Sequence, residues 1–510
     1  MNSHSKTIAK NAVVVGGATL ASRILGFIRD LIVAFALGAG PMADAFFVAF
    51  RLPNLLRRLF GEGSLTMAFV PVFTRTREED GEAEAHAFAR STLVWLVLIL
   101  GVITLGAILL ARPLVMLVAP GFADDPQLLT LTAELVRICF PYIIFISGVA
   151  LCMGILNSCN HFLAPALSPC VLNLMLIVSA LVGVGLGWSV PHCLAWGVLL
   201  AGLGQWLQQQ PYLAGVGFSW RGPWSFTHPG VKKTGRLMLP TVFGAAVYQI
   251  NIVLGTALAS FLAAGSISYL YYADRLVQFP LGVFGVAVST AALPSLSLLA
   301  ATGRLDEFRQ TLSASLRLTL FISLPATAGL LALAGPIVSL LFGRGAFSPE
   351  AVSLTAWALV AYAVGLPAFG LVRPLVSACY ALEDTRTPVR VGVVSLVVYV
   401  VSGVALMQVL DHVGLALATT ISSWVNVALL LRGLNQRLGH WADFWRVAAM
   451  YAGLSLVMGL AAWLTVGLGR WAVALIPLWG VGYALVSWKL KVPEALMVAD
   501  VLRRKFSGRS

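Results

Sequence analysis

Long apolar runs separated by short polar connections dominate this chain of 510 residues. A helix needs about 20 mostly apolar residues to cross a bilayer, so each sufficiently long run predicts one membrane-spanning helix. The sequence predicts fourteen such spans, at residues 11–37, 42–72, 91–118, 131–156, 165–188, 193–217, 238–263, 269–298, 313–341, 352–380, 389–410, 414–432, 446–468 and 472–489. The connections between them are too short for a soluble domain, which excludes catalysis by an appended domain.

The composition agrees with this pattern. The chain is 59% hydrophobic and 11% charged, whereas an ordinary soluble chain carries about 25% charged residues. We therefore expect an all-α polytopic membrane protein. Met1–Lys10 is polar, and no small-residue cleavage site follows the first apolar run, which predicts a retained first helix rather than a signal peptide. The six cysteines lack metal-ligand spacing and are interpreted as small buried apolar residues.

The basic residues are distributed unevenly between the connections. A net charge of +13 would suggest a nucleic-acid partner in a soluble protein, but here the placement of the charge matters more than its sum. With the N-terminus inside, 23 of the 34 Lys and Arg fall on the cytoplasmic side, against Arg344 and Arg470 alone on the other. The positive-inside rule then predicts that both termini are cytoplasmic and that no nucleic acid is involved.

An internal repeat is visible in the proline positions. Three pairs are each separated by 223 residues: Pro71 with Pro294, Pro113 with Pro336, and Pro165 with Pro388. The offset covers six predicted spans, an even number, so the two copies have the same orientation. They are expected to be related by a pseudo-two-fold axis along the membrane normal, with the substrate site between them.

The repeat predicts two six-helix lobes followed by two further helices. The expected division is an N-lobe at 1–217, a cytoplasmic linker at 218–237, a C-lobe at 238–433, the two added helices at 434–490, and a basic tail at 491–510. Tryptophans and basic residues at 218–236 suggest a strip on the membrane surface, and an ordinary solvated loop remains the alternative.

Nine arginines lie inside or at the edge of predicted spans: Arg23, Arg29, Arg51, Arg57, Arg58, Arg112, Arg137, Arg275 and Arg373. An arginine in hydrocarbon costs from about 3 to more than 10 kcal/mol, so these side chains are expected to be hidden from lipid. Arg58 and Glu62, four residues apart, are predicted to pair, and Arg51 lies on the same helical stripe. Arg112 and Arg137 lie near span ends and are expected to snorkel, while the role of Arg373 stays open.

Four arginines remain as a candidate anion site, namely Arg23, Arg29, Arg57 and Arg275. The guanidinium fork donates two parallel hydrogen bonds and stays protonated in a low dielectric, which suits a phosphate ligand. The alternative is that these arginines are internal ion-pair partners of Asp30, Asp44, Glu62 and Asp274.

No ATP-binding or hydrolase motif stands on a suitable turn, which argues against an ATP-driven pump. The energy would then come from an ion gradient, the membrane potential or the substrate gradient, and no cofactor is expected. Asp384 and Asp274 are candidate carboxylates for coupling to a monovalent cation, with helix-end or ion-pair roles as the alternative.

Several stretches resemble the MurJ/MviN lipid II flippases, from the first span to the last: SRILGFIRD (22–30), ADAFFVAFRLPNLLRRLFGEG (43–63), AFVPVF (68–73), APGF (119–122), YYADRLVQFP (271–280) and DTRTPV (384–389). The resemblance implies a non-enzymatic transporter with the multidrug/oligosaccharidyl-lipid/polysaccharide exporter fold, its two added helices forming a lipid-tail groove. It also implies transfer of undecaprenyl-pyrophosphate-linked disaccharide-pentapeptide from the cytoplasmic to the periplasmic leaflet of the bacterial inner membrane, by alternating access.

The resemblance further implies substrate-binding roles for Arg23, Arg29, Arg57, Arg275, Asp44, Asn54 and Ser268. Gln278 departs from the family pattern, because the best-known members carry glutamate there. Implied partners are lipid II, membrane lipids and the cell-wall synthesis and division machinery, with the chain as a monomer. The alternatives are an ion-coupled drug or solute antiporter, disfavoured by the positive first lobe, and a glycan-polymerising enzyme, disfavoured by the short loops.

Overall fold

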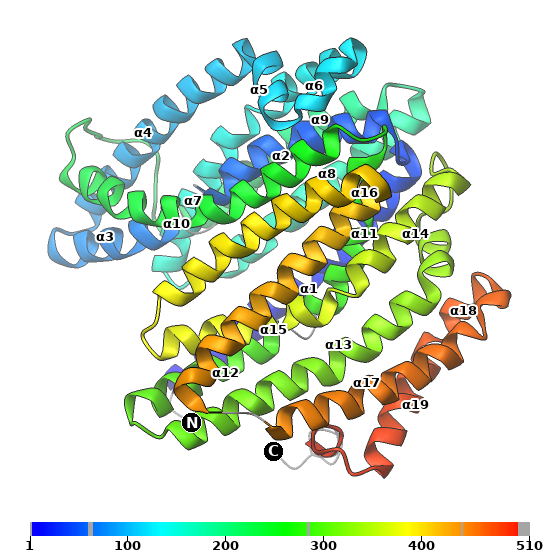
Figure 1. The fold of residues 1–510 in the computed structure, drawn as a ribbon. Helices are drawn as coiled ribbons and strands as arrows, with labels where there is room; N and C mark the ends of the chain where they lie inside the picture. Colours follow the sequence, from blue (N-terminus) through cyan, green and yellow to red (C-terminus); the bar gives the residue numbers. More distant parts are fainter. Residues whose placement is uncertain (1–2, 60–64, 283–285, 440–441, 498–510) are drawn as a thin grey trace. The chain divides into compact units, whose positions relative to one another are not determined.

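A computed structural model describes residues 3–59, 65–282, 286–439 and 442–497. Within these ranges every regular element is a helix, as Figure 1 shows, so the prediction of an all-helical chain is confirmed. Glu62 and the end of the basic tail lie outside the described residues.

The chain folds into two compact units. The first comprises Met1–Gly265 together with Gly345–Phe347, and the second comprises Ser266–Arg344 and Ser348–Ser510. Each unit is described by itself.

The first unit is built around α1, which packs along α8, and around α9, which packs against α7 and α8. A second centre forms where α3 and α4 meet α7, with Phe69 stacked on Phe73 and Phe88 at ring-centroid distances of 5.3 and 5.0 Å. The helices of this unit are α1 (Ser3–Leu37), α2 (Pro41–Leu59), α3 (Leu65–Glu79), α4 (Glu82–Leu109), α5 (Ala111–Val118), η2 (Pro120–Asp124), α6 (Pro126–Cys139), α7 (Tyr142–Ser158), α8 (Leu163–Leu186), α9 (Val190–Gly215) and α10 (Pro229–Ser260).

The second unit is organised by the long helix α13, which packs against α14, α15 and α17. Figure 1 shows α17 running beside α13, with α19 next to α17. Its core includes Leu316, Leu375 and Tyr451, all fully buried. The helices are α11 (Ser266–Pro280), α12 (Val286–Ala301), α13 (Leu305–Phe342), α14 (Pro349–Ala363), α15 (Leu366–Ala381), α16 (Arg386–Leu438), α17 (Ala442–Trp463), η4 (Val466–Leu468), α18 (Trp471–Ala474) and α19 (Ile476–Lys489).

Several predicted spans occur as broken or merged helices. Among the described residues, eight helices are long and apolar enough to cross a membrane, or nine if α14 and α15, bent by 41°, form one span. The expected span at 42–72 divides between α2 and α3, and that at 91–118 between α4 and α5. Conversely, the expected spans at 389–410 and 414–432 both lie in α16, separated by non-helical backbone at Asp411 (φ 46°, ψ −132°). The number fourteen stays a prediction.

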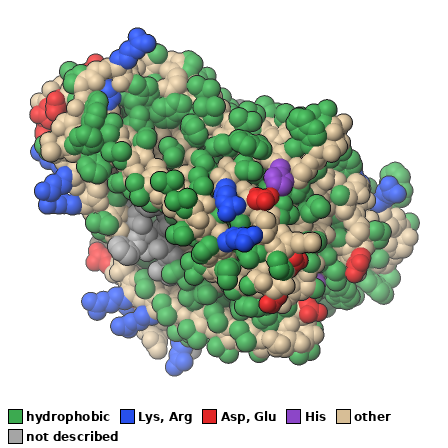
Figure 2. Space-filling view, turned by 90° about the horizontal axis from the view of Figure 1, so that it is seen from above, with side chains coloured by type: hydrophobic (Ala, Val, Ile, Leu, Met, Phe, Trp, Pro, Cys, Tyr) green, Lys and Arg blue, Asp and Glu red, His purple; other side chains and the backbone are tan. Residues whose placement is uncertain are grey.

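The surface of the chain is strongly apolar. Val102, Leu117 and Val409 are each more than 70% exposed, and many other large apolar side chains are exposed in the same helices. Figure 2 shows a face covered mostly by hydrophobic side chains, on which charged residues form small, separate groups. Because soluble monomers rarely expose such extensive apolar surface, this is the surface of a multi-pass membrane protein.

Candidate functional site

Arg29 of α1 belongs to the predicted arginine cluster and contacts two polar side chains. Its Nε and Nη2 donate to Oδ1 of Asp30 at 3.0 and 2.7 Å, and its Nη1 donates to Oδ1 of Asn173 on α8 at 3.0 Å. The Arg29 side chain is only 14% exposed and Asp30 is buried. The guanidinium is therefore held by two side chains, one charged and one neutral.

Asn173 is a residue that the sequence analysis missed. It is 5% exposed, and its Nδ2 donates to the backbone carbonyl of Ser22 at 3.1 Å, so its amide links the backbone of α1 to the Arg29 guanidinium. The available signal was a single asparagine in the mostly apolar stretch 163–186. A buried amide in a membrane helix needs polar partners, so such a residue indicates a polar contact with a neighbouring helix.

The other predicted residues of α1 and α2 have different surroundings. Arg23 is exposed, six residues before Arg29 on α1. Arg57 Nε donates to Oδ1 of Asn54 at 2.9 Å, so these two predicted residues are brought together near the end of α2. Asp44 is buried, and its Oδ2 accepts a hydrogen bond from the backbone N–H of Gly265 at 2.6 Å.

The arginines interpreted as structural also have identifiable positions. Arg51 Nη1 donates to Thr256 of α10, a neutral partner that helical spacing could not reveal. The predicted partner of Arg58, Glu62, lies outside the described residues, so this ion pair stays a prediction. Arg112, which donates to Thr130 at 2.9 Å, and Arg137 are both exposed, and so is Arg373.

In the second unit, the predicted residues lie on α11. The Arg275 guanidinium lies 4.7 Å from the centre of the Tyr271 ring, a cation–π geometry. Asp274 Oδ2 accepts from Nε2 of Gln278 at 2.6 Å, so the residue that departs from the family pattern contacts a candidate coupling carboxylate. Ser268 is fully buried.

Asp384 occupies the N-terminal end of α16. Its Oδ1 accepts from the backbone N–H of Arg386 at 3.1 Å and of Thr387 at 2.9 Å, and its Oδ2 accepts from the Thr387 hydroxyl and lies 2.8 Å from Nη2 of Arg437. The pKa of Asp384 is lowered, first by the backbone and hydroxyl bonds from Thr387 and then by the Arg437 charge. Asp384 therefore caps the start of α16 and pairs with Arg437. A role for Asp384 in ion coupling stays a prediction.

The described residues contain no group of three or more His, Cys, Asp or Glu that could hold a metal ion. What the first unit does provide is a set of arginines on α1 and α2, of which Arg29 is oriented by a carboxylate and an amide. Such a set suits an anionic ligand.

The fold is shared with known membrane transporters. A solved structure described as the inward-facing conformation of a multidrug resistance MATE family transporter of the MOP superfamily matches with a TM-score of 0.68, covering 84% of this chain and 98% of that one. The sequence identity is 14%, so this likeness shows the fold alone. The chain therefore has the fold of the MOP superfamily of membrane transporters.

The sequence is similar to a particular family within that fold. The family model for the lipid II flippase MurJ matches residues 33–482. The probable lipid II flippase MurJ of Vibrio cholerae is 38% identical, covering 94% of this chain and 95% of that protein, and the lipid II flippase MurJ of Burkholderia cenocepacia is 36% identical, covering 88% and 89%. The solved structure of lipid II flippase MurJ in an inward closed conformation matches with a TM-score of 0.79 at 27% identity, over 97% and 99% of the two chains.

The chain belongs to the MurJ family of lipid II flippases. This confirms the resemblance seen in the motifs. The family consists of transporters of the peptidoglycan pathway rather than enzymes, as the sequence analysis expected.

Proposed function

We propose that this chain moves lipid II, undecaprenyl-pyrophosphate disaccharide-pentapeptide, from the cytoplasmic to the periplasmic leaflet of the bacterial inner membrane. The observation that carries the proposal is family membership along nearly the whole chain, with relatives named lipid II flippases at 36 to 38% identity. The likeness to MATE transporters concerns the fold alone, and we propose no antiporter function from it.

In this proposal the lipid pyrophosphate is bound by Arg23, Arg29, Arg57 and Arg275. A pyrophosphate cannot enter hydrocarbon unaided, because its desolvation is too costly. Arginine offsets that cost through paired charge-assisted hydrogen bonds. The oriented guanidinium of Arg29 and the contact between Arg57 and Asn54 support this assignment, since fixed donors lose less entropy when they bind.

The buried polar residues Asp44 and Ser268 complete the proposed site. The carboxylate of Asp44 is bonded to the backbone N–H of Gly265, at the end of the long segment of the first unit. In the proposal it maintains the backbone around the site rather than contacting a pyrophosphate of like charge. Asp274 and Asp384 remain the candidates for coupling to a monovalent cation or to the membrane potential.

The architecture that we propose is the one expected from the repeat. Fourteen spans form two six-helix lobes, 1–217 and 238–433, joined by a linker at 218–237, and residues 434–490 form the groove for the polyprenyl tail. Both termini are cytoplasmic, and the headgroup crosses by alternating access of the lobes. A monomeric chain that works with the cell-wall synthesis machinery stays a prediction.

The test combines depletion of the protein with complementation. Depletion is expected to make the lipid-linked precursor accumulate on the cytoplasmic side, and the wild-type chain is expected to reverse this. A variant with Arg23, Arg29, Arg57 and Arg275 all changed to alanine is expected not to rescue. The matched control changes four exposed arginines outside the cluster, Arg112, Arg137, Arg344 and Arg470, and is expected to rescue. Rescue by the cluster variant would rule out the proposed site.

A further inference from the structure

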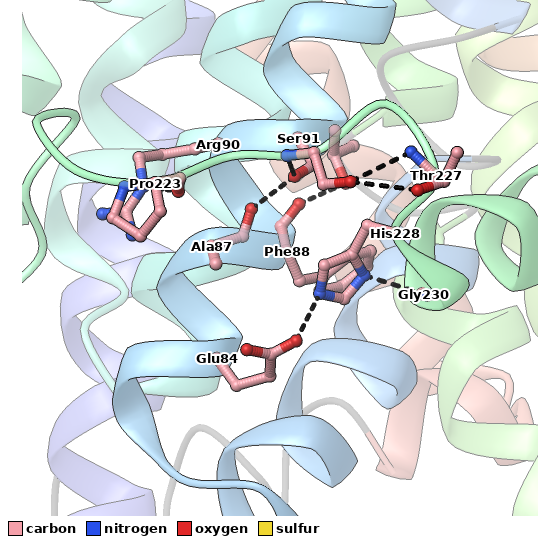
Figure 3. Close-up of polar contacts among 11 residues, drawn as sticks. Glu84, Ala87, Phe88, Arg90, Ser91, Pro223, Thr227, His228 and Gly230 are labelled. Atoms are coloured by element: carbon pink, nitrogen blue, oxygen red, sulfur yellow. Dashed lines mark hydrogen bonds and ion pairs between the residues drawn. The ribbon is translucent and has the colours of Figure 1, made fainter.

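The connection between α9 and α10 has no regular secondary structure over residues 218–227, here named the aromatic loop, yet it is fixed to the side of α4. Figure 3 shows the loop crossing α4 and its polar contacts with that helix. The aromatic loop and α4 belong to the first unit, so their contact is internal to that unit.

Arg90 of α4 makes the principal attachment. Its side chain donates from Nε to the carbonyl of Pro223 at 2.8 Å, and from Nη1 to the carbonyls of Ser219 and Arg221 at 3.0 and 3.2 Å. Arg90 is only 7% exposed. A buried guanidinium needs several acceptors, and the loop supplies three backbone carbonyls.

The loop passes very close to Arg90 at Gly222. This glycine has φ +135°, and a Cβ there would lie 2.9 Å from the Cζ of Arg90. Only glycine adopts this backbone without strain and also leaves room for the guanidinium.

Further bonds attach the loop along α4. Ser225 N–H donates to the Ser91 hydroxyl at 2.9 Å, and the Trp95 indole N–H donates to the Phe226 carbonyl at 3.0 Å. Just beyond the loop, His228 Nε2 lies 3.1 Å from Glu84. Contacts at both ends and in the middle hold the backbone in one conformation, so the exposed side chains project from fixed backbone positions.

The exposed side chains are aromatic and basic. Trp224 and Phe226 are 47% and 53% exposed, with their rings in an edge-to-face contact at 4.7 Å. The exposed basic residues of the loop and the start of α10 are Arg221, Lys232, Lys233 and Arg236. Residues 218–236 contain no Asp or Glu, so the charges that this segment itself exposes are all basic, and Glu84 of α4, beside His228, is the acidic neighbour named above.

The position of Trp95 gives the depth of the loop relative to a bilayer. The first turn of α4 is acidic, with Glu82 and Glu84, whereas beyond Trp95 the exposed side chains are apolar. They are Val97, Leu98, Ile99, Val102, Leu105 and Leu109. Aromatic residues on a membrane helix concentrate where water gives way to hydrocarbon, and Trp95 stands at that change. Because Trp95 bonds to Phe226, the aromatic loop lies at the headgroup level.

We propose that the aromatic loop and the start of α10 form a binding surface for anionic phospholipid headgroups. Arg221, Lys232 and Lys233 contact the lipid phosphates, while Trp224 and Phe226 insert at the boundary between headgroups and acyl chains. The positive surface excludes cationic partners, and a fixed aromatic pair beside the apolar face of α4 fits a lipid rather than a solvated ligand. This site is distinct from the arginine cluster that we assign to the substrate.

The first experiment measures lipid selectivity of the purified full-length protein in neutral detergent. Phosphatidylglycerol or phosphatidylcholine is added, and bound lipid is counted by native mass spectrometry. The wild type is expected to retain phosphatidylglycerol preferentially. In Arg221→Gln/Lys232→Gln/Lys233→Gln, retention is expected to weaken about fivefold for each charge removed. The control Arg390→Gln/Arg432→Gln/Arg446→Gln removes three exposed arginines elsewhere and is expected to keep the preference.

A second experiment asks whether lipid binding depends on the conformation of the aromatic loop or only on its positive charge. Arg90→Gln leaves the exposed basic residues in place but removes the three hydrogen bonds from Arg90 to the loop, and it is expected to reduce the preference for phosphatidylglycerol. In the otherwise unaltered protein, a photo-crosslinking benzoylphenylalanine in place of Trp224 is expected to crosslink to phosphatidylglycerol in vesicles containing equal parts of the two lipids.

Three outcomes would overturn the proposal. The first is an equal loss of preference in the control variant. The second is crosslinking from position 224 to a protein, or to neither lipid. The third concerns thermal unfolding of the purified wild type. An equal rise in its unfolding temperature with inorganic phosphate and with phosphatidylglycerol would indicate a phosphate site rather than a lipid surface. If Arg90→Gln does not elute as a folded protein, the crosslink and the charge variants decide the question.

Discussion

The surroundings of Arg29 illustrate how a largely buried charge is stabilised inside a helical unit. Its neighbour Asp30 balances the charge, while the amide of Asn173 orients the guanidinium without adding charge. Removing one partner of a buried ion pair is costly, because the remaining charge loses its compensation. Because Asn173 is neutral, it holds the guanidinium in place without adding to the charge compensation by Asp30.

This arrangement predicts that Asn173→Ala impairs transport. Loss of one bond to a buried guanidinium costs about 1–3 kcal/mol, equivalent to roughly a 5- to 150-fold loss of lipid II binding or translocation. Asn173→Asp keeps an acceptor for Arg29 and is expected to restore part of the activity. The measurement is lipid II translocation by the reconstituted protein, with Asn426→Ala as the control because the Asn426 Oδ1 has no partner within the described residues.

A second prediction at this scale concerns the pH dependence that Asp384 contributes. The pKa of Asp384 is lower in the folded chain than in the unfolded chain, where it is about 3.9. The ionised carboxylate therefore stabilises the fold at any pH above about 3.9. This stabilisation is lost as the pH falls through the pKa of the folded state. Because Arg437 is half exposed, their ion pair is worth about 0.2–1 kcal/mol.

Asp384→Asn tests this prediction, since asparagine still caps a helix but carries no charge. The variant is expected to be less stable than wild type at pH 7, with the difference shrinking as the pH falls below about 4. Thermal unfolding in detergent across this range measures it. A difference that does not change with pH would contradict the assignment.

At the scale of elements, close backbone approaches fix how the helices meet. Gly121, in the 3-10 turn η2, donates its N–H to the Ser260 hydroxyl at 3.0 Å, at the end of α10. A Cβ at Gly121 would lie 2.2 Å from the Ser260 carbonyl oxygen, a backbone atom that cannot move by itself. The packing of α10 against this turn therefore requires glycine.

We expect Gly121→Ala to destabilise the protein by about 1–3 kcal/mol, because it overpacks a backbone contact. The control is Gly106→Ala in α4, where a Cβ would meet nothing within 4 Å. That substitution is expected to be neutral, or stabilising by up to about 1 kcal/mol, since alanine favours helix. Thermal unfolding of the two variants in the same detergent distinguishes them, and equal effects would refute the packing argument.

At the scale of the whole molecule, the uneven distribution of basic residues predicts the orientation in the membrane. Arg470 lies in a connection expected on the periplasmic side and Arg304 in one expected on the cytoplasmic side, and both are exposed. Translocating a basic connection is unfavourable, so the side with few basic residues faces the periplasm.

Cysteine labelling of intact cells tests this orientation. With a membrane-impermeant thiol reagent, Arg470→Cys is expected to react and Arg304→Cys is not. The unsubstituted chain provides the background from its six native cysteines. Reaction at position 304 but not at 470 would reverse the predicted topology.

Much of the fold was predictable because membrane insertion depends on local hydropathy. The runs that became α8 and α9 were expected at 165–188 and 193–217, and they form Leu163–Leu186 and Val190–Gly215. The bends were harder to predict. A single non-helical residue at Asp411 separates two long helical segments, because the breaking of a helix depends on its neighbours as well as its own sequence.

The sequence by itself determined the helical membrane class, the family and the types of residue in the candidate site, because each depends on composition or on contiguous motifs. Only the tertiary structure decided which residues contact one another. Asn173 meets Arg29 across 144 positions, Asp44 meets Gly265 across 221, and Arg90 meets the Pro223 carbonyl across 133. Such contacts follow from helix packing, which places residues side by side without leaving any periodic trace in the chain.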